Sequence, residues 1–190
     1  MTTRIPLLDV EALEGPVGDA LRGRRSKLNI VAMMAHAQGC VVQQLQLGRA
    51  VNSEQDLDPL SRELLILLTA HLEDGEYVWR QHVPIAIQHG ASREKISALE
   101  KGDIASKAFS PDERALLVYG AQVVRGGAVD EVTFRAAARR YSHRELVEAI
   151  LAIGYYMTMN RITSATLTPL EAPDVEQPPS LDRQPGTVAR

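Results

Sequence analysis

The chain has 190 residues, of which 45% are hydrophobic, and its 21 basic and 24 acidic side chains give a formal net charge of −3. A nucleic-acid-binding protein usually has a basic face and a high pI, so this balance argues against a nucleic-acid partner. The longest apolar runs, such as 64–70, are much shorter than the roughly 20 residues of a membrane-spanning helix, so we also expect no membrane partner.

The N-terminal segment has no long apolar stretch after Arg4, so no secretory signal is visible. From there on the apolar spacing is helical, and no segment alternates like a strand. We therefore predict an all-α fold, a single-domain helical bundle. The predicted helices are 9–22, 29–35, 38–53, 59–72, 75–89, 92–100, 111–125, 129–140 and 143–165.

Several of these helices have clear start signals. Asp58 is followed by a proline, which suits an N-cap before the first helical position. Ser110 with Glu113, and Ser142 with Glu145, are spaced as capping boxes. These signals depend only on neighbouring residues, so they fix helix starts before any tertiary packing is known.

Stop signals divide the helical region from the end of the chain. Gly90 and Gly102 are typical of left-handed C-caps. Apolar periodicity ends near Glu171, where three prolines fall within nine residues. We therefore predict a helical domain at 1–170 and an extended or disordered tail at 171–190. The alternative is that the tail lies on a neighbouring subunit.

Two predicted helices have unusually wide apolar surfaces. Residues 64–68 are apolar all round, and 143–165 carries a broad apolar stripe. Such helices are normally buried in a bundle or at a subunit interface. Together they favour self-association into a homo-oligomer.

The candidate chemistry lies on two adjacent helices. Glu63 begins a strongly apolar helix, and His82 lies on the next one, 19 residues later. A short turn at 74–75 would set the two helices antiparallel, so that both side chains meet at a shared cleft. A carboxylate orients a neighbouring imidazole, which then serves as an acid or base near neutral pH. We predict contact within hydrogen-bonding or one-water reach, at the wall of a mostly apolar pocket.

A family resemblance is specific at these positions. In peroxidases of the alkylhydroperoxidase D-like family, a glutamate is followed twelve residues later by Cys-x-x-Cys-x-x-x-His. Glu63 and His82 match the glutamate and the histidine, Gly75 and Val78 stand at the two cysteine positions, and Tyr77 lies between them, where a relay residue can sit. The chain resembles the cysteine-free, carboxymuconolactone decarboxylase-like branch over about residues 4–170. The segments that carry the resemblance are 76–84, 90–96, 109–117, 142–148 and 154–156.

The resemblance implies a homo-oligomer, often trimeric or hexameric, that acts on a small molecule without a cofactor. It implies proton chemistry, such as decarboxylation, isomerisation, lactone opening or elimination on a small carbonyl or carboxylate compound. Peroxide reduction through a disulfide needs an attacking thiolate and a resolving thiol, and the motif positions supply neither. Cys40, the single cysteine, cannot form an intrachain disulfide, which suits a reduced, cytoplasmic protein; we expect it to be an inert core residue.

Arg62, Tyr77 and Trp79 are the predicted substrate-positioning residues. Arg62 could bind a carboxylate in bidentate fashion, although a solvated surface arginine is the commoner case. Tyr77 and Trp79 are more often packing residues than ligand contacts. No metal site is expected: a close-set pair of histidine ligands is spaced i, i+4, whereas His82 and His89 are two turns apart, about 10 Å along a helix.

Three hypotheses follow. The first is a cofactor-independent enzyme with His82 as acid/base and Glu63 as its orienting partner. The second is a non-catalytic helical oligomer that binds a small molecule or a partner in the same cleft. The third, redox function through Cys40, requires an exposed, reactive thiol near a base.

Overall fold

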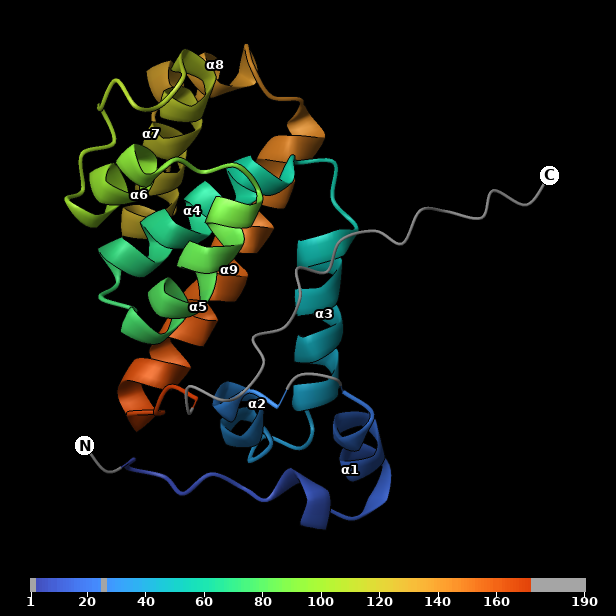
Figure 1. Cartoon of the computed structure of the whole chain (residues 1–190). Coiled ribbons are helices and arrows are strands. Elements are labelled where there is room, and N and C mark those ends of the chain that lie inside the picture. Colours follow the sequence, from blue (N-terminus) through green and yellow to red (C-terminus); the bar gives the residue numbers. More distant parts are fainter. Residues whose placement is uncertain (1–2, 25–26, 172–190) are drawn as a thin grey trace.

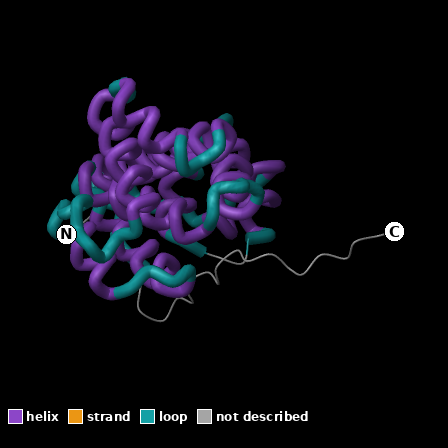
Figure 2. The backbone as a smooth tube through the Cα atoms, turned by 90° about the horizontal axis from the view of Figure 1, so that it is seen from above, coloured by secondary structure: helices purple, strands orange, loops and turns teal. Residues whose placement is uncertain are grey.

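The computed structural model describes residues 3–24 and 27–171, so the predicted tail lies outside the described residues except for Glu171. Within that part, the chain consists of helices and loops without strands, as Figure 2 shows, and the predicted all-α fold is confirmed. After a 3-10 turn, η1 (Val10–Ala12), the elements are α1 (Gly15–Arg22), α2 (Asn29–Met34), α3 (Val41–Ser53), α4 (Pro59–Leu72), α5 (Glu76–Gln88), α6 (Arg93–Glu100), α7 (Pro111–Gly126), α8 (Glu131–Ala138) and α9 (His143–Thr166).

Helix α4 is the centre of the bundle. It contacts α5, α6, α7 and α9 (Figure 1), and every residue from 61 to 70 is buried. The apolar segment 64–68 is at most 1% exposed, which confirms that its all-round apolar surface faces other helices. Burial of each such side chain stabilises the fold by about 1.5–3 kcal/mol. The same burial carries Arg62 and Glu63 into the interior.

The predicted helix starts are confirmed. The Asp58 side chain accepts a hydrogen bond from the backbone N–H of Ser61 at 3.0 Å. Both predicted capping boxes, at the starts of α7 and α9, have their two reciprocal hydrogen bonds. Gly90 and Gly102 have φ angles of +97° and +69°, as left-handed helix ends require.

Two predicted boundaries were wrong. The helix expected at 9–22 is interrupted, because Gly15 has φ +76° and Pro16 occupies the first turn of α1. Proline lacks the N–H that a continuous helix needs and restricts the residue before it. The helix expected from 38 begins at Val41 after turns at 35–40.

A tight turn joins α4 to α5 and places their facing sides together. Asp74 takes a left-handed conformation (φ +52°), and the Gly75 N–H donates to the Ala70 carbonyl oxygen at 2.7 Å. Helix α9 packs against both α4 and α5 (Figure 1), so a polar residue on the inner side of any of these three helices meets the other two. None of the described helices is long and apolar enough to cross a membrane.

Candidate functional site

Glu63 and His82 meet between α4 and α5. Glu63 Oε2 lies 2.8 Å from His82 Nδ1, and because an ionised carboxylate only accepts hydrogen bonds, Nδ1 donates. The Glu63 side chain is 2% exposed, whereas the His82 side chain is 12% exposed. The predicted contact is therefore confirmed, with the carboxylate inside the bundle and the imidazole nearer its surface.

The His82 ring is held from a second side by α9. Its centroid lies 4.7 Å from that of Tyr156, with an interplanar angle of 81°, the edge-to-face arrangement that aromatic rings prefer. The Tyr156 hydroxyl donates to Asn52 Oδ1 on α3 at 3.1 Å. Burial raises the pKa of Tyr156 well above its usual value, and the Glu63 charge raises it further. The phenol therefore keeps its proton beside the imidazole.

Arg62 lies beside the same carboxylate. It is only 5% exposed, so the expectation of a solvated surface arginine was wrong; the all-round burial of α4 encloses it. Its Nε is 3.7 Å from Glu63 Oε1, close enough for charge attraction but too far for a hydrogen bond. Nε is buried and has no hydrogen-bond partner among the described residues. A buried guanidinium N–H without a partner can donate a hydrogen bond to a negatively charged oxygen.

Sequence reasoning missed Tyr156 and Asn52 as site residues. Tyr156 belonged to the apolar stripe of its helix, and a hydroxyl among apolar residues could have signalled a buried hydrogen bond. Asn52 had no such signal, because its partner lies 104 residues further along the chain. The Glu63–His82 pair thus has a neighbour from α9, Tyr156, which is itself hydrogen-bonded to α3.

Tyr77 and Trp79 lie in the first turn of α5, before His82. Tyr77 is 7% exposed, and its hydroxyl donates to the Glu171 carboxylate and accepts from the Ile30 N–H at 3.3 Å. Burial raises the pKa of Tyr77, and the hydrogen bond to Glu171 adds to this effect. Trp79 is partly buried and packs against two core clusters.

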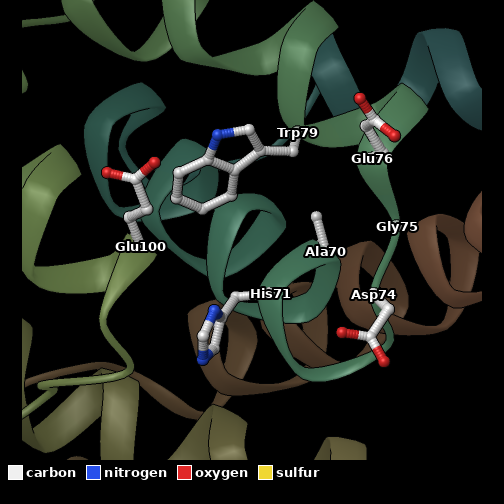
Figure 3. A pocket seen from close by; sticks show the side chains of 7 residues that line it. All are labelled: Ala70, His71, Asp74, Gly75, Glu76, Trp79 and Glu100. Carbon is white, nitrogen blue, oxygen red and sulfur yellow. The ribbon is translucent and has the colours of Figure 1, made fainter.

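A shallow cavity of about 280 Å³ opens beside the α4–α5 turn (Figure 3). Three carboxylates and the Trp79 indole surround it, and neither Glu63 nor His82 lines it. We predicted that the pair lies at the wall of a mostly apolar pocket, but neither residue of the pair lines this cavity, which has three carboxylates around it. Its lining residues are Ala70, His71, Asp74, Gly75, Glu76, Trp79 and Glu100.

Thiol chemistry has little support in the geometry. Gly75 is buried in the α4–α5 turn, and Val78 is buried in the first turn of α5. Neither residue carries a thiol. Cys40 is exposed at the start of α3, so its predicted place in the core was wrong; the turns before α3 carry it to the surface. Within 3–24 and 27–171, no group of three or more metal-binding side chains gathers in one place.

Comparisons of the sequence and of the fold point to related proteins. Residues 41–117 match the Carboxymuconolactone decarboxylase family, a segment that contains both Glu63 and His82. An uncharacterized peroxidase-related protein from Ralstonia eutropha, an alkylhydroperoxidase AhpD core, superimposes with a TM-score of 0.77 at 15% identity, over 89% of this chain and 92% of that one. The chain therefore contains a segment that matches this family, within a fold similar to that of alkylhydroperoxidase D-like proteins.

Two further solved structures have a similar fold. A protein of unknown function from Agrobacterium tumefaciens is similar with a TM-score of 0.67 and 20% identity, over 73% of this chain and 95% of that one. The debrominase Bmp8, crystallised with 2,3,4-tribromopyrrole, has a TM-score of 0.72 and 19% identity, over 90% and 93% of the two chains. A search of curated proteins found no match. At these identities the likenesses concern the fold alone.

Proposed function

We propose that this protein is a cofactor-independent acid/base enzyme acting on a small carbonyl or carboxylate compound, by decarboxylation, isomerisation or elimination. The observation that carries the proposal is the 2.8 Å hydrogen bond between the buried Glu63 carboxylate and His82 Nδ1. A histidine held in this way is the commonest proton-transfer group in enzymes.

The hydrogen bond determines which ring nitrogen reacts. Since Nδ1 donates to Glu63, the neutral imidazole has its lone pair on Nε2, and no hydrogen bond joins Nε2 to the described residues. Nε2 then accepts a proton from the substrate and returns it at another atom. The imidazolium formed in between is stabilised by the adjacent Glu63 charge, while Tyr156 restrains the ring.

Arg62 supplies the positive charge that such a reaction needs. Proton abstraction next to a carbonyl, or loss of carbon dioxide, leaves negative charge on a substrate oxygen. A guanidinium enclosed in the bundle stabilises that oxygen more than a solvated one would, because the surroundings have a low dielectric constant. Arg62 is buried, lies beside the Glu63–His82 pair and has an unpartnered Nε, so it is the residue that we assign to this role.

Trp79 is proposed as a secondary substrate contact, whereas the Tyr77 hydroxyl is already bonded to Glu171 and to the Ile30 N–H. Trp79 lies one turn before His82 on α5 and lines the 280 Å³ cavity, so it connects the two regions. The debrominase complex supports a small planar ligand as the class, since that protein has the same fold and holds a tribromopyrrole.

The alternative is a non-catalytic oligomer that binds a small molecule or a partner. The separation of the cavity from His82 favours it, because a ligand there would lie beside carboxylates and an indole rather than beside the imidazole. A thiol peroxidase is the least favoured function, since Gly75 and Val78 replace the motif cysteines.

The test uses a panel of small β-keto acids, lactones and cyclic ketones in D₂O. Nuclear magnetic resonance follows loss of carbon dioxide and deuterium exchange next to the carbonyl, with wild type and His82→Gln at equal folded concentration. We expect turnover of at least one compound to fall by roughly 10²–10⁴-fold in the variant, the usual contribution of a positioned acid or base. Compounds that bind without turnover would support the binding alternative, and equal turnover in both proteins would contradict the catalytic role.

A further inference from the structure

We propose that Tyr77, Gln81 and the backbone N–H of Asn29 form a binding site for a small carboxylate with an apolar body, which the chain's own Glu171 fills in this structure. The site lies on a different face of α5 from His82, and the proposal does not rest on the reaction proposed above.

The Glu171 carboxylate is bound through both of its oxygens. Oε1 accepts from the Asn29 N–H at 2.7 Å and from the Tyr77 hydroxyl, while Oε2 accepts from Gln81 Nε2. These donors come from α2 and from two successive turns of α5, since Tyr77 and Gln81 are spaced i, i+4. Three convergent donors from separate elements make a site with a defined geometry.

All three donors are neutral. Within the described part of the chain, no lysine or arginine forms an ion pair with Glu171. The carboxylate is therefore bound by hydrogen bonds alone. Another carboxylate that reaches the same position can accept the same three hydrogen bonds. Burial and the adjacent carboxylate both raise the pKa of Tyr77, so its hydroxyl stays protonated and remains a donor.

The surroundings of Tyr77 indicate the rest of the ligand. Its ring belongs to a core cluster that also contains Ile30, Val31, Met34 and Tyr156. A ligand whose carboxylate replaces that of Glu171 would place its body where the Glu171 side chain lies, against Tyr77 at the edge of this cluster. An apolar or aromatic acid fits this position better than a polar one, because apolar contact with the Tyr77 ring replaces water there.

The segment that carries Glu171 is held in place by contacts that do not involve the Glu171 side chain. The Thr168 N–H donates to the Thr163 carbonyl oxygen at 3.0 Å, and Asn29 Nδ2 donates to the Pro169 carbonyl oxygen at 3.1 Å. The chain after α9 is thus held by contacts that do not involve the carboxylate. Removal of the carboxylate leaves the donors in place and vacant, which is the condition for an external acid to bind.

The experiment measures benzoate binding to the full chain by calorimetry. Glu171→Ala should bind benzoate about tenfold or more tightly than wild type, because an intramolecular competitor is removed. Glu14→Ala, the same change at a glutamate without a side-chain capping bond, is the matched control and should leave binding unchanged. Adding Tyr77→Phe to Glu171→Ala should abolish the gain, and adding His82→Gln should preserve it, which separates this site from the proposed active site.

Equal benzoate binding by wild type and Glu171→Ala would overturn the proposal, as would a gain that survives Tyr77→Phe. A lower melting temperature of Glu171→Ala without benzoate binding would mean that Glu171 is only a structural tie. If Glu171→Ala does not fold, Glu171→Gln serves with ¹³C-tyrosine labelling. Benzoate should then shift the Tyr77 resonance in this variant more than in wild type, and an unchanged resonance would also overturn the proposal.

Discussion

The Asn160 carboxamide fills the space in which a side chain at position 75 would begin. A Cβ atom on Gly75 would lie 2.0 Å from Asn160 Oδ1 and 2.4 Å from its Cγ, and contacts this short cannot exist. Asn160 is 1% exposed, and neither of its carboxamide atoms has a hydrogen-bond partner among the described residues. Position 75 is the first cysteine position of the peroxidase motif, so here an amide from α9 occupies the region of the missing thiol.

This contact predicts strong coupling between the two positions. Gly75→Ala should lower the free energy of unfolding by about 1–3 kcal/mol, because the extra methyl group overpacks a closed site. Adding Asn160→Ala should recover much of the loss, which gives a coupling energy of about 0.5–3 kcal/mol in a double-mutant cycle. Urea unfolding of the four proteins measures it. Strictly additive effects would mean that the two residues do not meet.

The Glu63–His82 pair predicts a ranking of two variants. Glu63→Gln keeps an oxygen that can accept from His82 Nδ1 but removes the charge beside the imidazolium, so turnover should fall by roughly tenfold or more. His82→Gln should cost more in turnover while its melting temperature stays near that of wild type, since glutamine can still donate to Glu63. If the pair is only structural, both variants should lose activity in proportion to the folded fraction, which circular dichroism measures alongside turnover.

Buried tyrosines predict a loss of stability in alkali. Burial raises the pKa of Tyr77, Tyr155 and Tyr156 above the ordinary value of 10.0. Above that pH the unfolded chain releases these phenol protons while the folded chain retains them. The contribution of these tyrosines to the free energy of unfolding should therefore be constant below about pH 9 and should fall, above about pH 10, by about 1.4 kcal/mol per pH unit for each such group. Tyr156→Phe should reduce the slope by one group, as guanidinium titrations from pH 8 to 11.5 would show; an unchanged slope would contradict this.

Local chemistry explains which features the sequence could predict. Asp58 and the two capping serines accept hydrogen bonds from backbone N–H groups three residues later. Because donor and acceptor are so close in sequence, these hydrogen bonds could be predicted from the sequence alone. The Glu63–His82 contact followed from a turn of known position between two helices. The break at Gly15-Pro16 has a local signal as well, because a proline marks the first turn of a helix rather than its interior, whereas apolar spacing alone runs on across the break.

The remaining features depend on which distant segments pack together. The burial of Arg62 follows from helices on all sides of α4, and no residue next to it in sequence indicates this. The contact of Tyr77 with Glu171 joins residues 94 positions apart. Periodicity gives the face of a helix but not the partner of that face, so these contacts could be found only in the folded chain.

The exposed position of Cys40 predicts that it is dispensable. Cys40→Ser changes a side chain at the surface end of α3 and removes no core contact, so the melting temperature and turnover should be those of wild type. Hydrogen peroxide consumption with dithiothreitol should be equal in both proteins. A large loss of turnover in folded Cys40→Ser would instead favour the redox hypothesis.

The outer face of α9 predicts self-association. Val147, Ile150 and Leu151 are 56%, 43% and 48% exposed, and their i, i+3, i+4 spacing places them together on one side of the helix. The same helix buries its opposite side against α4 and α5. Apolar side chains clustered in this way are typical of an interface between copies.

We therefore expect light scattering at micromolar concentration to give a multiple of the 20.8 kDa chain mass, with a trimer or a hexamer as the expected state. Leu151→Glu should shift the mass toward one chain, because a charge in an apolar interface loses its hydration without gaining a partner. Leu47→Glu places the same change on α3, at a leucine that is 41% exposed, and should leave the mass unchanged. Circular dichroism would confirm that both variants are folded. A wild-type mass of one chain would exclude the oligomer. An oligomer that resists Leu151→Glu but dissociates with Leu47→Glu would move the interface from α9 to α3.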